Sequence, residues 1–349
     1  MNKKSRFRRL DLCDNPKSKN RNRKCAVLLG IAVSLLMCRA VVQAQTSGKI
    51  PRIGYLGSTA EGSDIREFRR GLRDLGYVEG KNILIESRHR YANGGQDRSA
   101  SLIEELVQLK VDILVSPVGP AIIAAKKATS SIPIVMVSNV DPVTTGIINS
   151  LARPGGNITG LASLTRELGG KRLELLKELD PRVSRVGVLW STTPGLGFRT
   201  GFQSYETAAH ALKIALHSLE VRSPTPDLDG AFRDAIKARA DAIVTSRNSL
   251  LARQRRQIAE LAIKNRLPSM FEGTSFVEAG GLIAYSVHDA DQHRRAAVYV
   301  DKILKGAKPA DLPVEQASKF EMAINLKTAK QIGLTIPPQV LARADKVIR

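Results

Sequence analysis

The sequence predicts an α/β protein made of two similar Rossmann-like lobes, each a parallel sheet covered by helices on both faces. Two observations predict this fold class. First, the segment Arg52–Gly62 (RIGYLGSTAEG) recurs as Arg185–Gly195 (RVGVLWSTTPG). Second, short apolar runs alternate with longer amphipathic ones after each copy, as strands and helices do in parallel sheets. We therefore expect two copies of one unit, with a cleft between them.

The repeat extends well beyond its first motif. Three later segments recur in the same order, at offsets of 125 to 135 residues. The pairs are 111–116 with 240–245, 132–137 with 267–272, and 155–161 with 280–286. Because the order is kept while the loop lengths drift, duplication of one unit explains the pattern better than chance.

Hydrophobic periodicity and turn residues place the elements of the first copy. In the first helix, Ile65, Phe68, Leu72 and Leu75 recur at helical spacing, and Gly76 is a natural stop. The predicted order is a strand from Arg52, a helix at 65–75, a strand at 82–87, a helix at 99–110, a strand at 111–116, a helix at 120–129 and a strand at 132–137.

The second copy repeats this scheme and continues to the C-terminus. The predicted order is a helical segment at 171–179, a strand at 186–190, a helix at 203–213, a strand at 216–221, a helix at 229–238, a strand at 242–246, a helix at 250–265 and a strand at 268–272. There follow a helix at 291–305, extended segments at 312–316 and 320–325, and helices at 327–332 and 338–347. No low-complexity linker separates the copies, so we expect the lobes to exchange strands at a hinge.

The first 44 residues have the composition of a secretory signal peptide. A basic segment precedes the 14 apolar residues of Cys25–Cys38, and Val42–Ala44 supplies a small-residue exit. An apolar run of this length is short for a membrane span. We expect export to the periplasm and cleavage near Ala44. All three cysteines lie in this segment, so the exported protein is expected to contain no disulfide and no cysteine metal site.

The formal charge of +21 does not by itself indicate nucleic acid. Residues 1–44 contain 11 Lys and Arg against two Asp, or +9, which leaves 43 minus 31, or +12, for the rest. These charges are scattered over amphipathic helices, and only Arg253–Arg256 forms a tight basic group. Aromatic residues make up 4% of the chain, too few to suggest base-stacking platforms. We expect a solvated basic surface and no nucleic-acid partner.

Candidate site residues follow the predicted strands, because ligands of parallel sheets bind at the carboxyl ends of the strands. In the first copy these are Ser58, Thr59, Gly119, Pro120 and Asp141. In the second copy they are Ser191, Thr192, Asn248, Ser249 and Glu272. Hydroxyl and amide groups suit a small polar or zwitterionic solute. Backbone N–H groups would hold the carboxylate of that solute, and Asp141 or Glu272 would hold its amine. The alternatives are helix capping by the hydroxyls and a turn role for Asp141 before Pro142.

The sequence lacks the marks of catalysis or of a cofactor. None of the five histidines lies in a nucleophile or zinc motif, and neither a dinucleotide fingerprint nor a phosphate-binding loop occurs. His288 and His293, with the aspartates between them, are a candidate metal pair, but Asp291–Arg295 also has the pattern of a capped helix start. We therefore predict no enzyme, no catalytic residue, no cofactor and no bound metal.

Several runs together resemble a known family. They are Gly71–Asn82, Ile132–Val135, Asp141–Val143, Leu151–Gly160, Lys171–Glu178, Lys305–Gln316, Ile324–Lys330 and Leu341–Asp345. From about Ile53 to the C-terminus the chain is similar to the ABC transporter substrate-binding protein family, typified by tryptophan-uptake-like binding proteins. Two departures stand out: Tyr285-Ser286-Val287 replaces a usual Tyr-Gly pair, and Ala317 replaces a common proline.

The resemblance implies a type I periplasmic-binding fold with three crossings between the lobes. The N-terminal lobe would comprise residues 45–161 and about 287–316, and the C-terminal lobe residues 162–286 and about 317–349. It implies capture of a small solute, an amino acid of aromatic type being favoured, for an inner-membrane ABC permease. Tyr285 joins the candidate ligand residues on this ground. We expect a monomer that closes around its solute.

Two other functions remain open at this point. A periplasmic sensor subunit would present its closed form to a receptor instead of a permease. An exported enzyme on the same scaffold is not excluded by the fold alone, although it would need a convergent catalytic set that is not apparent. A two-lobed transcription factor is disfavoured, because a signal peptide occupies the place of a DNA-binding domain.

Overall fold

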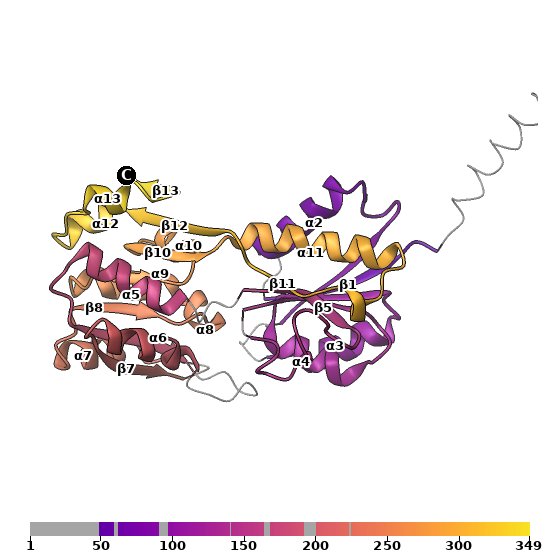
Figure 1. Ribbon diagram of the computed structural model, residues 1–349, viewed down its shortest axis with the longest axis horizontal. Coiled ribbons are helices and arrows are strands. Elements are labelled where there is room, and N and C mark those ends of the chain that lie inside the picture. Colours follow the sequence, from indigo (N-terminus) through magenta and orange to yellow (C-terminus); the bar gives the residue numbers. More distant parts are fainter. Residues whose placement is uncertain are drawn as a thin grey trace, which may run out of the picture. The chain divides into compact units, whose positions relative to one another are not determined.

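Two β-sheets, each with helices on both faces, organise the chain (Figure 1). The computed structural model describes residues 49–58, 62–90, 97–139, 141–163, 168–191, 200–222 and 225–349. The predicted signal segment, Thr59 and Thr192 lie outside these ranges. Residues 51–349 form one compact unit. Among the helices that the structure describes, none combines the length and the apolar character needed to cross a membrane.

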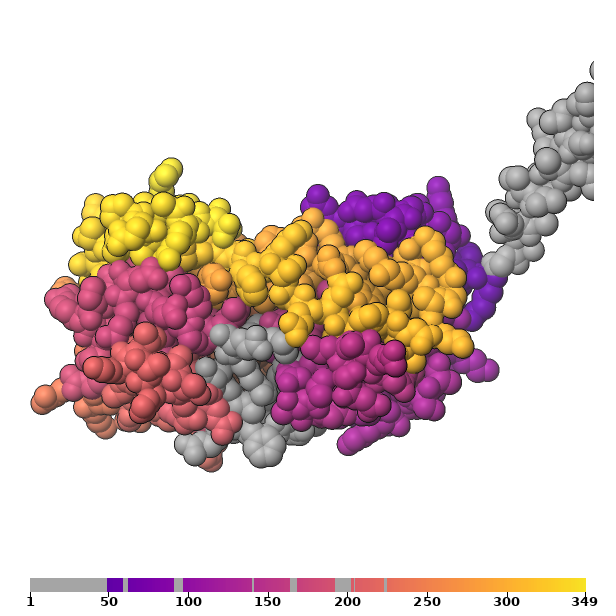
Figure 2. Space-filling view, viewed as in Figure 1, coloured from indigo at the N-terminus to yellow at the C-terminus, as the bar shows by residue number. Residues whose placement is uncertain are grey.

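The first sheet has six parallel strands in the order β2-β1-β3-β4-β5-β11. Its strands are β1 (Arg52–Gly57), β2 (Leu84–His89), β3 (Ile113–Ser116), β4 (Ile134–Ser138), β5 (Ile158–Ala162) and β11 (Glu315–Gln316). Helices α2 (Ser63–Asp74) and α11 (Asp289–Leu304) pack on one face, and α3 (Ser99–Gln108) and α4 (Gly119–Ala128) on the other. The short 3-10 helix η1 (Pro309–Asp311) precedes β11. Figure 2 shows α11 in orange beside α2 in indigo at the surface.

The second sheet has seven strands in the order β7-β6-β8-β9-β10-β12-β13. Its strands are β6 (Arg185–Ser191), β7 (Ala215–Val221), β8 (Ala242–Thr245), β9 (Ser269–Phe271), β10 (Ile283–Val287), β12 (Phe320–Asn325) and β13 (Lys346–Ile348). One face carries α5 (Leu168–Leu179), α6 (Thr200–Ala211), α12 (Leu326–Gln331) and α13 (Pro338–Leu341). The other carries α7 (Leu228–Lys237), α8 (Ser249–Arg253), α9 (Arg255–Lys264) and α10 (Thr274–Glu278).

Corresponding side chains make the same contacts in the two copies. Asp112 accepts a hydrogen bond from the backbone N–H of Arg52 at 2.8 Å, and Asp241 accepts one from Arg185 at 2.8 Å. A Cβ atom built on Gly54 would lie 3.0 Å from the Leu114 side chain. A Cβ atom built on Gly187 would lie 2.8 Å from the side chain of Ile243, the counterpart of Leu114 in the second copy. The repeat seen in the sequence is therefore a repeat of packing and strand order.

The chain passes between the two sheets three times, after β5, after β10 and after β11. The two later crossings lie side by side, because the His288 N–H donates to the Lys319 carbonyl at 3.0 Å. Strand β12 returns antiparallel to β10, with Val287 opposite Phe320. The predicted parallel arrangement holds for the other strands of this sheet, whereas β12 and its neighbour β13 run the opposite way, and the chain enters β12 from β11 of the first sheet through the third crossing.

Several predicted elements differ from the structure in their bounds, and β5, β10 and α10 were not predicted as elements. The strand predicted at 82–87 is β2, two residues later. The helix predicted at 250–265 is broken at Gln254, whose backbone dihedrals (φ −91°, ψ 10°) leave the helical region. The helix predicted at 338–347 ends at Leu341. Asp345, directly before β13, accepts from the Met322 N–H at 2.8 Å, as Asp112 and Asp241 accept from the backbone N–H groups of β1 and β6.

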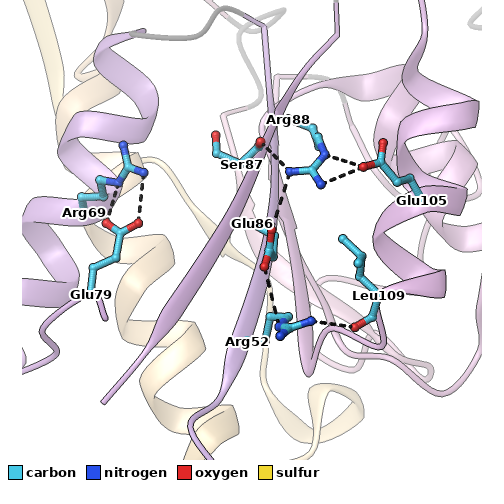
Figure 3. Close-up of polar contacts among 8 residues, drawn as sticks. All are labelled: Arg52, Arg69, Glu79, Glu86, Ser87, Arg88, Glu105 and Leu109. Atoms are coloured by element: carbon cyan, nitrogen blue, oxygen red, sulfur yellow. Dashed lines mark hydrogen bonds and ion pairs between the residues drawn. The ribbon is translucent and has the colours of Figure 1, made fainter. Parts of the chain in front are cut away.

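Edge strand β2 carries a charged ladder on one face (Figure 3). Arg88 donates to Glu105 of α3 at 2.7 Å and approaches Glu86 at 3.7 Å, and Glu86 in turn lies 3.7 Å from Arg52 of β1. The charges cover an edge strand, a common protection against pairing with another chain. Arg90 follows directly after this strand.

Candidate solute-binding site

Both sheets place a topological switch point at their carboxyl edge. The strand order reverses between β1 and β3 in the first sheet and between β6 and β8 in the second, and open α/β sheets bind ligands beside such a point. Ser58 follows β1, and Gly119 begins α4 after β3. Ser191 ends β6, and Ser249 begins α8 after β8. The sequence therefore selected residues at both switch points.

Residues of the two carboxyl edges contact each other through Arg90. Its side chain is 7% exposed, although it follows an edge strand. Its Nη1 donates to the Ser249 hydroxyl at 3.2 Å, and its Nη2 is paired with Asp97. Burial acts to raise the pKa of Asp97, but hydrogen bonds from Arg90 and Ser99 outweigh it and lower that pKa, which keeps the carboxylate ionised. Arg90 is not among the residues predicted from the sequence.

The start of α4 offers backbone N–H groups at the first switch point. Val118 occupies the position before the helix, and its side chain has no acceptor atom. The Ser116 hydroxyl fixes the preceding turn, because it donates to the Leu56 carbonyl at 2.8 Å and accepts from the Val118 N–H at 3.1 Å. Pro120 follows Gly119 in the first helical turn. In the second sheet, by contrast, the Asn248 side chain caps α8 by accepting from Leu250 at 2.7 Å.

Glu272, expected to hold an amine, is engaged by other side chains. It is 6% exposed, and its Oε1 accepts from Arg172 Nη1 at 2.8 Å and from the Tyr205 hydroxyl at 3.0 Å. Arg172 is fully buried and also donates from Nε to the Tyr285 carbonyl at 2.9 Å. Burial and the Glu272 carboxylate raise the pKa of Tyr205 well above its ordinary value. This cluster braces β9 and β10 behind the carboxyl edge.

The sequence pattern around Arg172 indicates that this residue faces the core. It stands on the apolar face of α5, in line with Leu168, Leu176 and Leu179 at helical spacing. A charged residue at a core-facing position requires a buried partner, because an unpaired charge is costly inside a protein. That pattern signals an internal ion pair, although it does not identify Glu272 as the partner.

Asp141 has the turn role that was its alternative. Its Oδ1 accepts from the Val143 N–H at 2.9 Å and from the Thr144 N–H at 3.3 Å, and the Thr144 hydroxyl donates to Oδ2. The Thr145 hydroxyl donates to the Asp141 carbonyl at 2.7 Å. This pattern is an Asx-type turn, which uses the carboxylate to order the loop after β4.

Charged side chains surround the paired crossings. Arg247, after β8, donates to Asp289 at the start of α11 at 2.7 Å. Burial acts to lower the pKa of Arg247, but Asp289, Glu272 and Glu321 raise it, so the guanidinium stays charged. Lys319, in the third crossing, donates to Asp291 of α11 at 2.7 Å. These pairs tie the crossings to both neighbouring sheets.

The two histidines of the alternative metal site have separate roles. His288 Nδ1 accepts from the Asp291 N–H at 3.2 Å and caps α11. His293 is 8% exposed, and burial, the dominant effect, lowers its pKa. Within the described ranges, there is no group of three or more His, Cys, Asp or Glu side chains that could hold a metal ion.

Comparison with known proteins identifies the family. The model of the ABC transporter substrate binding protein family matches residues 61–348. The chain belongs to this family. It is a family of non-enzymatic binding proteins, which usually work outside the cytoplasm.

Related proteins agree in fold. The substrate-binding protein is 26% identical over 267 residues to a tyrosine-binding protein of Clostridioides difficile, covering 76% of this chain and 75% of that one. A conserved domain protein from Vibrio cholerae is 27% identical, with a TM-score of 0.78 over 86% of this chain and 100% of that one. An ABC domain from Streptococcus pneumonia in complex with L-Trp is 26% identical, with a TM-score of 0.74 over 85% and 100%. The fold is that of type I periplasmic-binding proteins.

Proposed function

We propose that this substrate-binding protein captures an aromatic amino acid between the carboxyl edges of its two sheets and delivers it to an inner-membrane ABC permease. The observation that carries the solute class is that two relatives, similar over most of their length, are named for tyrosine or contain L-Trp. The Arg90 contact to Ser249 supports the location, because it joins the carboxyl edge of the first sheet, beside β1, to the switch point of the second sheet.

Closure of two lobes around the solute would follow from this arrangement. The proposed lobes keep the bounds expected from the sequence, with the N-terminal lobe built on the first sheet and the C-terminal lobe on the second. Solute that touches both edges binds the closed form better than the open form, and therefore shifts the population towards closure. The Gly119 N–H, at a helix start without a side-chain cap, suits the solute carboxylate. Asp141 and Glu272, already engaged within the fold, are weaker candidates for the amine than the sequence suggested.

Solute binding is tested by the thermal unfolding midpoint of the purified protein with L-Trp, L-Tyr, L-Phe, L-Leu and L-Glu. A ligand that binds only the folded state stabilises it by about 2.7 kcal/mol at a concentration 100 times its dissociation constant. We expect the midpoint to rise with the aromatic amino acids and to stay constant with L-Glu. A protein whose midpoint responds to none of the aromatic amino acids would refute the proposed solute class.

The proposed location is the periplasm, and the proposed state is a monomer. The predicted signal segment is the support for export. Expression of the full chain in a Gram-negative host, followed by N-terminal sequencing of the periplasmic fraction, should give a protein that begins near Gln45. A protein that keeps Met1 and stays in the cytoplasm would contradict export.

A further inference from the structure

Among the residues that the structure describes, most aromatic side chains are buried, and two of the three exceptions stack on each other. Among the described residues, the aromatic side chains that are not buried are Tyr77, Tyr285 and Phe320. The Tyr77 hydroxyl donates to Asp301 at 3.0 Å, which gives that ring a local role. Tyr285 and Phe320 instead stack on each other. Phe320 keeps 41% of its surface exposed, whereas the other described phenylalanine side chains are buried.

The stacked pair has the geometry that aromatic rings prefer. The ring centroids are 6.1 Å apart and the planes differ by 20°, which is an offset stack. Tyr285 covers part of the Phe320 ring, while the exposed part of that ring remains accessible to a further flat group. The pair therefore forms a small platform with an open side.

The platform lies at the carboxyl edge of the second sheet. Phe320 is the first residue of β12 and pairs with Val287, the last residue of β10. Tyr285 lies two residues earlier on β10. Lys319, directly before Phe320, belongs to the third crossing. The exposed ring thus stands beside the crossings, at the sheet edge where the solute is proposed to bind.

The fold holds the platform rigid from behind. The Tyr285 carbonyl accepts from Arg172 Nε at 2.9 Å, and the fully buried Arg172 is itself paired with Glu272. Strand β12 is hydrogen-bonded on both sides, to β10 and to β13. A surface that is already ordered loses little conformational entropy when a ligand stacks on it.

We propose that Phe320, backed by Tyr285, is the surface on which the aromatic ring of the solute stacks, and that it selects aromatic over aliphatic amino acids. This inference rests on the proposed function and adds a residue that determines specificity. The recognition is by stacking of aromatic rings: both residues present a π face, which an aryl or indole group matches and a branched aliphatic chain does not.

Titration calorimetry of the purified protein with L-Trp, L-Tyr and L-Leu tests the inference. The variants are Phe320→Ala, Phe320→Leu and Phe320→Tyr, with Ile236→Ala as the control, because Ile236 is an equally exposed apolar residue on α7 (45% exposed). We expect Phe320→Ala and Phe320→Leu to weaken binding of L-Trp and L-Tyr roughly three- to tenfold. Phe320→Tyr and Ile236→Ala should bind as the wild type does.

The outcomes separate this inference from the proposed function. If the wild type and Phe320→Ala bind L-Trp with equal affinity, the role of Phe320 is overturned and the proposed solute class stands. Absence of any aromatic amino acid binding by the wild type would overturn both. Phe320→Leu keeps an apolar side chain at the sheet edge, so it provides the comparison if the alanine variant has a lowered unfolding midpoint.

Discussion

At the scale of single residues, Glu272 is held by Arg172 and Tyr205 within a fully enclosed cluster. Two opposite charges removed from water stabilise the fold only when both are present, because either one alone keeps its desolvation cost. The hydroxyl of Tyr205 also donates to the Thr245 carbonyl at 3.0 Å, which links the cluster to β8. The charge of Glu272 therefore serves the fold behind the proposed site.

Replacement of Glu272 by glutamine should be strongly destabilising. The amide keeps the shape of the side chain but removes the negative charge that offsets the buried Arg172 guanidinium. We expect Glu272→Gln to lower the free energy of unfolding by about 3 kcal/mol. Urea denaturation of the two proteins measures this difference in the free energy of unfolding. The matched control is Glu174→Gln, which breaks the exposed Lys171 pair at 3.0 Å and should cost less than about 0.5 kcal/mol. Equal effects of the two variants would contradict the anchoring role.

Asp241 should make stability depend on acid pH. Burial acts to raise its pKa, but hydrogen bonds from Ser184 and Arg185 outweigh burial and lower it from 3.8. A depressed folded-state pKa gives stability that is complete above the unfolded value and is lost as pH falls through the folded value. Asp241→Asn should therefore be less stable than the wild type by about 1 kcal/mol at pH 7. The difference should shrink below about pH 4, measured by urea denaturation from pH 7 to pH 2.5. A constant difference would contradict the assignment.

At the scale of elements, four helix-to-strand connections use a basic residue in the left-handed conformation. They are Lys110, Lys213, Arg239 and Arg266, with φ between 52° and 55°. Each lies shortly after a helix of a strand-helix unit, where glycine is the residue that adopts this conformation without strain. The same geometry therefore recurs in both copies, and it was not visible in the sequence, because the expected glycine is absent.

Arg239→Gly should stabilise the protein. Glycine removes the steric cost of the left-handed conformation, about 1 kcal/mol, and part of this gain is offset by the greater freedom of the unfolded chain. We expect a net gain of about 0.5 kcal/mol in the free energy of unfolding. The control Lys237→Gly, within α7, should instead cost about 1 kcal/mol, because the residue is helical there. Destabilisation by both variants would show that the side chain of Arg239 contributes more than its backbone strain costs.

Local pattern predicted most elements, and long-range contacts account for those it did not. The strand at 52–57 and the helix at 99–110 were recognisable because their apolar periodicity is strong. The end of the chain was assigned as helix, since the period of 338–347 fits one. Its last residues form β13 because the edge of β12 is open to pairing, and only the recurrence at Asp345 of an aspartate that accepts from a strand N–H signals this.

Strand topology placed the candidate site residues in the sequence, whereas contacts across the fold decide what some of their side chains do. Ser58, Gly119, Ser191 and Ser249 lie at the switch points, as parallel-sheet topology requires. The turn role of Asp141 was an alternative visible in the local sequence, but the engagement of Glu272 depends on Arg172, 100 residues away, which no local pattern specifies. Arg90 and Phe320 were missed for the same reason, because their significance lies in contacts across the fold.

At the scale of the whole molecule, two similar sheets share the last part of the chain and are joined by three crossings. Both carboxyl edges carry a switch point, and Arg90 links them through Ser249. Such an arrangement permits rotation about the crossings without unfolding either sheet, which is the motion expected of a protein that encloses a solute. Solute binding is therefore expected to close the molecule.

Small-angle X-ray scattering of the purified protein, without solute and at saturating L-Trp, measures that change directly. The account predicts a smaller radius of gyration with L-Trp, and an unchanged radius with L-Glu as the control. A radius that stays the same while calorimetry shows L-Trp to be bound would contradict closure around the solute.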